Sequence, residues 1–333
     1  SGSKFFRHFP IPQFLNMSAV GLHISEDAIR YAEIIEKYGR LSLGKYGSKS
    51  LPQGTIQGGE LINPGQLRGV LRVLRKEIGT PFVHVSIPEE KVYLFKTEVP
   101  SEGVVSAYNF IELRIEENIP IPVGETIFDF EPIKQNFKKS DHVNVAVVAV
   151  PKKTTNVFSS ALSNSGFVIS SMQPESGAIL RSVVEEGDNG NHLIVCFGET
   201  RTVISLVSGG VPRFSSSIPV GSEAIAKGIG RHFSVGIEEA KHILKVRGYA
   251  RNRSNMELLY QLMGLISVVK DEVAKVISYW QTHREEDNEV SRKVSSIILS
   301  GKGSALVGFN EYLMLSLHAK VSYANVWRNI FLF

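Results

Sequence analysis

The residues best placed to do chemistry lie in one segment, Leu193–Gly210. Its pattern predicts a buried strand, a tight Gly-Glu-Thr turn and a second strand. A turn of this kind can hold backbone N–H groups towards a phosphate. A hairpin that handles phosphates would normally carry an acid just before Phe197 and Gly198, but this chain has Cys196 there. The segment therefore has the frame of a nucleotide-cleaving site without an evident carboxylate.

A later glycine turn is a second candidate anion site. The sequence predicts a strand over Ile297–Ser300, a turn at Gly301-Lys302-Gly303 and a helix over Ala305–Leu317. This order places glycine amides and a helix N-terminus beside any bound anion. Turns of this type are common between strands and helices, so the motif indicates little by itself.

Composition narrows the class of protein. The chain has 333 residues, 43% hydrophobic and 21% charged, which is typical of a globular protein of about two domains. Its net charge is +4 and it has no long Lys/Arg block, so we expect no nucleic-acid partner. Cys196 is the only cysteine, which excludes an intrachain disulfide and fits a reducing compartment. Inside an apolar strand, its thiol is expected to be inert.

The elements that position these residues come in two similar halves. The first half predicts a hairpin over Ala19–Glu36 that matches the hairpin of Leu193–Gly210 in the second half. The other strands expected are Phe82–Pro88, Val92–Val99, Ile127–Glu131 at an edge, Val143–Val150 and Gly166–Ser170. The helices expected are Asn63–Ile78, Ser101–Glu117, Thr154–Ser165, Ser176–Glu186, Ser222–Phe233, Ile237–Val246 and Met256–His283. Polar turns are expected at Phe137–Asp141 and His283–Asn288.

Two matching hairpins followed by a late glycine turn resemble the actin-like ATPase superfamily. Within it, the chain resembles the PilM family of type IV pilus assembly proteins. The segments that carry the likeness are Glu112–Pro122, Ile127–Glu131, Val145–Lys152, Met172–Arg181, Ile218–Glu223 and Tyr323–Asn329. The resemblance implies an α/β, actin-like ATPase fold: two ribonuclease-H-like domains with a small α+β inserted subdomain and a nucleotide between the domains.

The resemblance also implies a division of the chain. Residues 1–18 form an N-terminal tail, and residues 19–80 with 151–188 form the first ribonuclease-H-like domain. Residues 81–150 form the inserted, partner-binding subdomain. Residues 189–333 form the second ribonuclease-H-like domain, with a helical subdomain at about 222–290.

The partner that the resemblance implies is a PilN-like inner-membrane protein, whose short cytoplasmic N-terminal tail binds in a groove beside the inserted subdomain. The chain is then expected to be cytoplasmic, with indirect membrane contact, as a scaffold of the type IV pilus or a related type II secretion platform. The pilus motor ATPase and a second copy of the chain are further candidate partners.

The nucleotide contacts that the resemblance implies are spread over three segments. They are Ser25, Glu26, Asp27 and Arg30; Gly198, Glu199, Thr200 and Thr202; and Gly221, Glu223, Lys227, Gly301, Lys302, Gly303 and Ser304. The amides of Gly198, Glu199 and Thr200 and the hydroxyls of both threonines are expected to donate to phosphate, and the third segment to hold adenosine.

Catalysis is the weak point of this resemblance. The family's acidic positions are His23 and Ser25 in the first hairpin and Cys196 in the second, and neither imidazole nor thiol is a hard oxygen ligand for Mg²⁺. Glu175 survives as the one candidate catalytic acid. Loss of a transition-state electrostatic element costs on the order of 10² or more in rate. We therefore expect weak or absent ATP hydrolysis and no confident metal ligand, and leave binding of ATP and Mg²⁺ open.

Two other functions are compatible with the sequence. One is an actin-like protein that binds and hydrolyses ATP, which the retained glycine turns favour. The other is a cell-division filament protein like FtsA, which would carry a C-terminal amphipathic helix that is not evident before Phe333.

Overall fold

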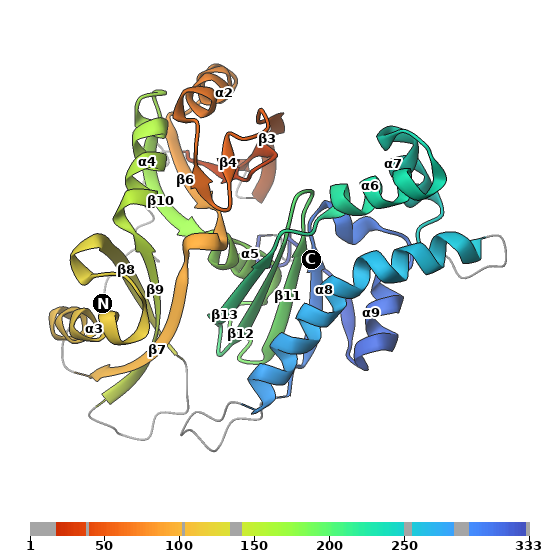
Figure 1. The fold of residues 1–333 in the computed structure, drawn as a ribbon. Coiled ribbons are helices and arrows are strands. Elements are labelled where there is room, and N and C mark those ends of the chain that lie inside the picture. Colours follow the sequence, from red (N-terminus) through yellow and green to blue (C-terminus); the bar gives the residue numbers. More distant parts are fainter. Residues whose placement is uncertain are drawn as a thin grey trace. The chain divides into compact units, whose positions relative to one another are not determined.

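The computed structural model describes most of the chain. The described ranges are 18–37, 40–101, 104–133, 142–249, 255–282 and 293–330. The predicted N-terminal tail, except for Ser18, and the turns expected at Phe137–Asp141 and His283–Asn288 lie outside them. The chain divides into two compact units, Ser1–Pro88 with Lys153–Gln173 and Glu89–Lys152 with Pro174–Phe333 (Figure 1).

The first unit is built around a five-stranded sheet in the order β10-β6-β1-β2-β3. Its elements are β1 (Val20–Ile24), β2 (Ala28–Lys37), β3 (Arg40–Ser50), β4 (Ile56–Gln57), β5 (Glu60–Leu61), α2 (Pro64–Glu77), β6 (Phe82–Ile87), α4 (Lys152–Ser163) and β10 (Val168–Pro174). Strand β1 is antiparallel to β2 and parallel to β6. We call β1, β2 and the turn between them the first hairpin.

Helix α2 shows why these residues fold as expected. The side chain of Asn63 accepts a hydrogen bond from the Gln66 amide, and Pro64 occupies the first turn, where its missing N–H costs nothing. Leu67, Leu71 and Leu74 recur at helical spacing and are fully buried. Capping and apolar spacing thus agree on the same helix.

The second unit contains another five-stranded sheet, in the order β13-β12-β11-β14-β15. Its elements are α5 (Glu175–Val183), β11 (Asn191–Phe197), β12 (Thr202–Ser208), β13 (Val211–Ile218), α6 (Ser222–Phe233), α7 (Ile237–Val246), α8 (Met256–Thr282), β14 (Ser296–Ser300), η5 (Lys302–Ala305), α9 (Phe309–Leu317) and β15 (Val321–Tyr323). Strand β11 is antiparallel to β12 and parallel to β14. This is the connection pattern of β1 with β2 and β6, so the predicted repeat is confirmed. We call β11, β12 and their turn the second hairpin.

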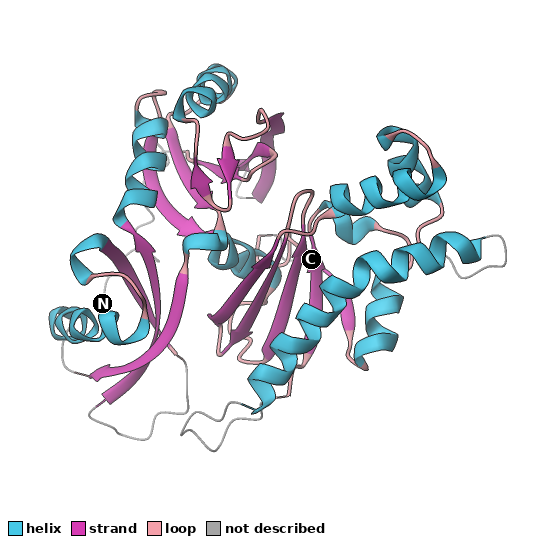
Figure 2. Ribbon diagram, in the orientation of Figure 1, coloured by secondary structure: helices cyan, strands magenta, loops and turns pink. Residues whose placement is uncertain are grey.

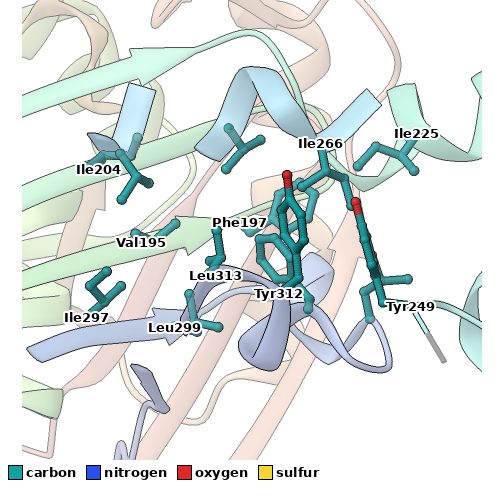
Figure 3. Close-up of a cluster of buried hydrophobic side chains, with 14 of the residues drawn as sticks. Val195, Phe197, Ile204, Ile225, Tyr249, Ile266, Ile297, Leu299, Tyr312 and Leu313 are labelled. Atoms are coloured by element: carbon teal, nitrogen blue, oxygen red, sulfur yellow. The ribbon is translucent and has the colours of Figure 1, made fainter. Parts of the chain in front are cut away.

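The core of this unit lies between its sheet and its helices. Helix α8 is the long helix that runs beside this sheet in Figure 2. Its residues Leu262, Ile266, Val269 and Val273 belong to the same buried cluster as the strands. Figure 3 shows side chains from β11, β12, β14, α6, α8 and α9 converging there. Apolar burial on this scale fixes the end of β11, where the second hairpin turns.

The second unit also contains what we call the insert, a three-stranded sheet in the order β7-β9-β8 with one helix. It comprises η2 (Glu89–Lys91), β7 (Tyr93–Pro100), α3 (Val104–Asn118), η3 (Val123–Glu125), β8 (Thr126–Pro132) and β9 (His142–Pro151). The insert has its own core, formed by α3 residues such as Ile111 and Ile115 packed with Val145 and Val147. As expected, β8 is an edge strand. Both η2 and β7 contact β13 of the larger sheet.

The structure differs from the expected elements at several strands and at one helix. Strands β3 and β13 were not predicted, because β3 has no buried residue among those described and β13 carries three consecutive serines that break the apolar pattern. The helix expected from Ala305 is also wrong: a short 3₁₀ helix follows Gly301, and α9 begins only at Phe309. None of the described helices has the length and apolar character needed to cross a membrane.

Candidate functional site

The turn of the second hairpin is held by its own backbone and by α6. The Gly198 amide donates to the Arg201 carbonyl at 2.9 Å. The Ser222 amide donates to the Gly198 carbonyl at 3.0 Å, and the Glu223 amide donates to the Glu199 carbonyl at 2.9 Å. The Gly198 amide is therefore not available to a phosphate, contrary to expectation, and the first amides of α6 are used by the turn.

Close packing around this turn accounts for the glycines. A Cβ at Gly221 would lie 2.3 Å from the Glu199 carbonyl oxygen, and one at Gly301 would lie 2.5 Å from the Phe197 oxygen. Gly301 also has φ +85°, a left-handed conformation that favours glycine. A Cβ at Gly303 would meet the Phe197 ring at 2.7 Å. Because the fold itself requires these glycines, their pattern does not by itself indicate a bound nucleotide.

Arg201 is the centre of a buried charge cluster beside the turn. Its side chain is almost fully buried, and Nη2 donates to Glu175 Oε2 at 2.8 Å. Nη1 forms an ion pair with Glu90. Glu90 lies in η2 at the start of the insert and Glu175 is the first residue of α5, so one guanidinium joins the hairpin to two other elements. Each terminal nitrogen of the guanidinium thus pairs with a different carboxylate, and charge-assisted hydrogen bonds of this kind are among the strong ones.

Cys196 and Glu89 complete this cluster. The Cys196 thiol donates to the second oxygen of Glu175 at 3.5 Å, and the side chain is only half-buried. The burial on which the expectation of an inert thiol rests is therefore only partial. Glu89 accepts a hydrogen bond from the Ser176 amide at 2.9 Å. Burial raises the pKa of the Glu89 carboxyl, and hydrogen bonds from Ser176 and Ser215 oppose that rise.

The other predicted contacts of the second unit are engaged within the protein. Thr202 is fully buried and donates to the Val220 carbonyl at 2.6 Å, so its hydroxyl proton is not free for a phosphate. The Ser304 hydroxyl donates to the Gly301 carbonyl at 2.7 Å. Lys302 Nζ donates to Glu199 Oε2 at 2.8 Å. On α6, Lys227 and Glu223 pair with each other at 2.9 Å. The amides of Glu199 and Thr200 and the Thr200 hydroxyl stay candidates.

The turn of the first hairpin is held by side chains that are close together in the sequence. Asp27 and Arg30 form an ion pair across the turn, and the Arg30 guanidinium also donates to the Ser25 hydroxyl at 2.8 Å. Burial raises the pKa of the Asp27 carboxyl, but hydrogen bonds from Arg30 and Ser25 outweigh it, so the pKa lies below its usual value. The Glu26 carboxylate accepts a hydrogen bond from the Gly58 amide at 2.7 Å. His23 stands opposite Arg30 in the strand register. The charge of Asp27 is thus compensated by Arg30 within the turn.

Comparison with known proteins places the chain in a family. Residues 21–332 match the family described as "Type IV pilus assembly protein PilM". The chain belongs to the PilM family. Its role is therefore in type IV pilus assembly. A search of curated proteins found no match to the sequence.

Solved structures show the same fold as this PilM family member. A chain of a PilM-PilN type IV pilus biogenesis complex has a TM-score of 0.76 at 18% identity, covering 94% of this chain and 90% of that one. The structure of MreB5 of Spiroplasma citri bound to ADP matches with a TM-score of 0.59 at 12% identity, covering 95% of this chain and 94% of that one. The ethanolamine utilization protein EutJ from Carboxydothermus hydrogenoformans matches with a TM-score of 0.55 at 14% identity, covering 96% of this chain and 88% of that one. These likenesses show an actin-like ATPase fold.

The residues of the second hairpin do not fit the Mg²⁺ that this fold class uses with ATP. Mg²⁺ takes oxygen ligands, but the Glu199 carboxylate of the turn is paired with Lys302, and those of Glu90 and Glu175 beside it are paired with Arg201. Within the described ranges, no group of three or more His, Cys, Asp or Glu side chains is arranged to hold a metal ion.

Sequence reasoning missed the residues that dominate this cluster. Glu175 was expected as a catalytic acid, but Arg201 and Glu90 were not singled out. One signal was present: Arg201 is a long charged residue between two threonines in a turn that otherwise carries small residues and one glutamate. Its partners lie 111 and 26 positions away in the chain (201 minus 90 and 201 minus 175), so local patterns could not identify them.

Proposed function

We propose that this chain serves type IV pilus assembly as a scaffold: it binds the cytoplasmic N-terminal tail of a PilN-like membrane protein through the insert and does not turn over nucleotide. The observation that carries the first part is the likeness to a PilM chain solved in a PilM-PilN complex, which extends over 94% of this chain. In this proposal the protein is cytoplasmic and reaches the inner membrane through its partner. The predicted domain boundaries, including a partner-binding subdomain at 81–150, belong to the same proposal.

The surface of the insert supports a role in binding. Ile127 of β8 is 45% exposed, whereas Phe128 and Phe130 of the same strand pack against the insert's core. Strand β8 is also an edge strand, with one side open to an added strand. An extended tail with an apolar side chain would gain main-chain hydrogen bonds along β8 and cover Ile127.

A peptide titration tests the partner. A fluorescently labelled peptide with the N-terminal cytoplasmic sequence of a PilN-like protein should bind saturably to the full chain, as measured by anisotropy. Ile127→Asp should weaken binding at least tenfold, because it places a charge on an apolar contact beside the β8 edge. Ile62→Asp is the matched control, since Ile62 is 55% exposed in the first unit and should leave the affinity unchanged. No binding to the folded chain at high micromolar concentration would refute the proposal.

The charge pairing of the second hairpin supports the absence of turnover. Hydrolysis needs an acid or a metal to orient water and neutralise developing charge. Glu175 is bound on one oxygen by Arg201 and on the other by Cys196, so neither oxygen is held ready for a water molecule. The expected outcome is no phosphate release above background when ATP and Mg²⁺ are added to the chain. Phosphate release that disappears in Glu175→Ala would contradict it.

A further inference from the structure

The feature that the pilus role leaves unexplained is the buried guanidinium of Arg201. Two carboxylates, Glu90 and Glu175, converge on it from separate elements of the second unit. Converging buried carboxylates are otherwise the usual ligands of a divalent cation. Here a side chain of the protein itself provides the positive charge.

We propose that Arg201 is a built-in replacement for the divalent cation, and that it closes the second hairpin to both metals and phosphates. This inference goes beyond the proposed scaffold role, because it assigns a specific residue as the reason that the site is shut. It concerns only the second unit, in which all the residues of the cluster lie.

Exclusion of a metal follows from geometry. The guanidinium donates to Glu175 Oε2 at 2.8 Å and pairs with Glu90, so it uses the carboxylate oxygens that a metal would need. A metal ion that entered would also lie beside a fixed positive charge in a buried region, where charges are weakly screened.

Exclusion of a phosphate follows from charge. Two carboxylates against one guanidinium leave the trio with a net charge of −1 when all three are ionised. The thiol of Cys196 adds no positive charge, and Lys302 at the rim is already paired with Glu199 at 2.8 Å. A phosphate group would therefore meet an acidic cluster whose one buried guanidinium is taken.

The test exchanges one charge at a time. Arg201→Met removes the positive charge and keeps a side chain of similar length, so the oxygens of Glu90 and Glu175 that the guanidinium occupied become accessible to a cation. Electron paramagnetic resonance with Mn²⁺ should show at least tenfold tighter binding by this variant than by the unmodified chain, and Mn²⁺ should raise its melting temperature. Equal Mn²⁺ affinities would overturn the proposal.

The reciprocal variant keeps the test decisive if Arg201→Met does not fold. Glu90→Gln with Glu175→Gln leaves Arg201 charged and without its carboxylates, so inorganic phosphate should raise the melting temperature of this variant and not that of the unmodified chain. The unmodified chain provides a further test. If it binds Mn²⁺ and Glu175→Gln abolishes that binding, the proposal is overturned. Titration with the tail peptide is a separate measurement, so failure of the scaffold proposal would be distinguishable.

Discussion

The two hairpins share a strand pattern but are stabilised in different ways. In the first, Asp27 and Arg30 pair across three residues of one turn, with the arginine side chain 38% exposed. In the second, Arg201 is 8% exposed and reaches Glu90 and Glu175 on other elements. One hairpin thus depends on neighbours in sequence, and the other on partners that only the folded unit brings together. The difference shows that a repeated framework does not impose a repeated electrostatic arrangement.

Removal of the two arginines should give the largest contrast. Arg201→Met takes the guanidinium away from two largely buried carboxylates and should lower the free energy of unfolding by about 3–5 kcal/mol. Arg30→Met, its matched control in the first hairpin, should cost less than about 1 kcal/mol, because the pair is partly solvated. Urea denaturation of both variants measures the difference. Similar losses would mean that the buried cluster contributes no more than the exposed pair.

The glycines beside the hairpins should differ next. Gly301→Ala places a Cβ 2.5 Å from the Phe197 oxygen at φ +85° and should cost about 3 kcal/mol or more. Gly58, whose amide binds Glu26 of the first hairpin, has φ +52° with open space around it, so Gly58→Ala should cost about 1–2 kcal/mol. Melting temperatures of the two variants rank them. A larger loss for Gly58→Ala would show that the close packing at Phe197 relaxes easily.

Acidic groups near the two hairpins should respond to pH with opposite sign. The pKa of Asp27 is lowered in the folded chain. Its contribution to the free energy of unfolding is therefore present above the usual pKa of 3.8 and is lost as pH falls through the folded pKa. Glu89 has a raised pKa, so its contribution is present below 4.5 and is lost as pH rises through the folded pKa. Unfolding free energies of Asp27→Asn and Glu89→Gln, measured between about pH 3 and pH 7, should each lack one of these slopes. A Glu89→Gln curve parallel to the unmodified one would contradict the assignment.

The smallest effect is expected at the rim of the second hairpin. Lys302 and Glu199 form a pair in which the lysine side chain is 62% exposed. Lys302→Ala should therefore lower the free energy of unfolding by less than about 1 kcal/mol, and the difference should disappear at about 1 M salt, where the screening length is about 3 Å. A salt-independent loss would show that Lys302 contributes through packing of its stem instead.

Much of the framework could be predicted from local patterns. Helix α2 carries its cap and its leucine spacing in consecutive residues, and the two hairpins follow from apolar strands around short turns. Strand β3 could not be predicted in this way, because its stability comes from pairing along β2 and not from burial of its own side chains. The start of α9 was placed too early. Gly308 has a left-handed backbone conformation, so the helix begins only after it, at Phe309.

The sequence by itself determined the actin-like framework and the family, because both follow from patterns along the chain, and it predicts that His23 and Cys196 stand where the family has acids. Only the tertiary structure decided which charges meet beside the second hairpin. Arg201, Glu90 and Glu175 have no shared local pattern, and their meeting depends on a sheet, a 3₁₀ helix and a helix start packing together. Long-range ion pairs are selected by burial, which excludes water and makes every buried charge require a partner.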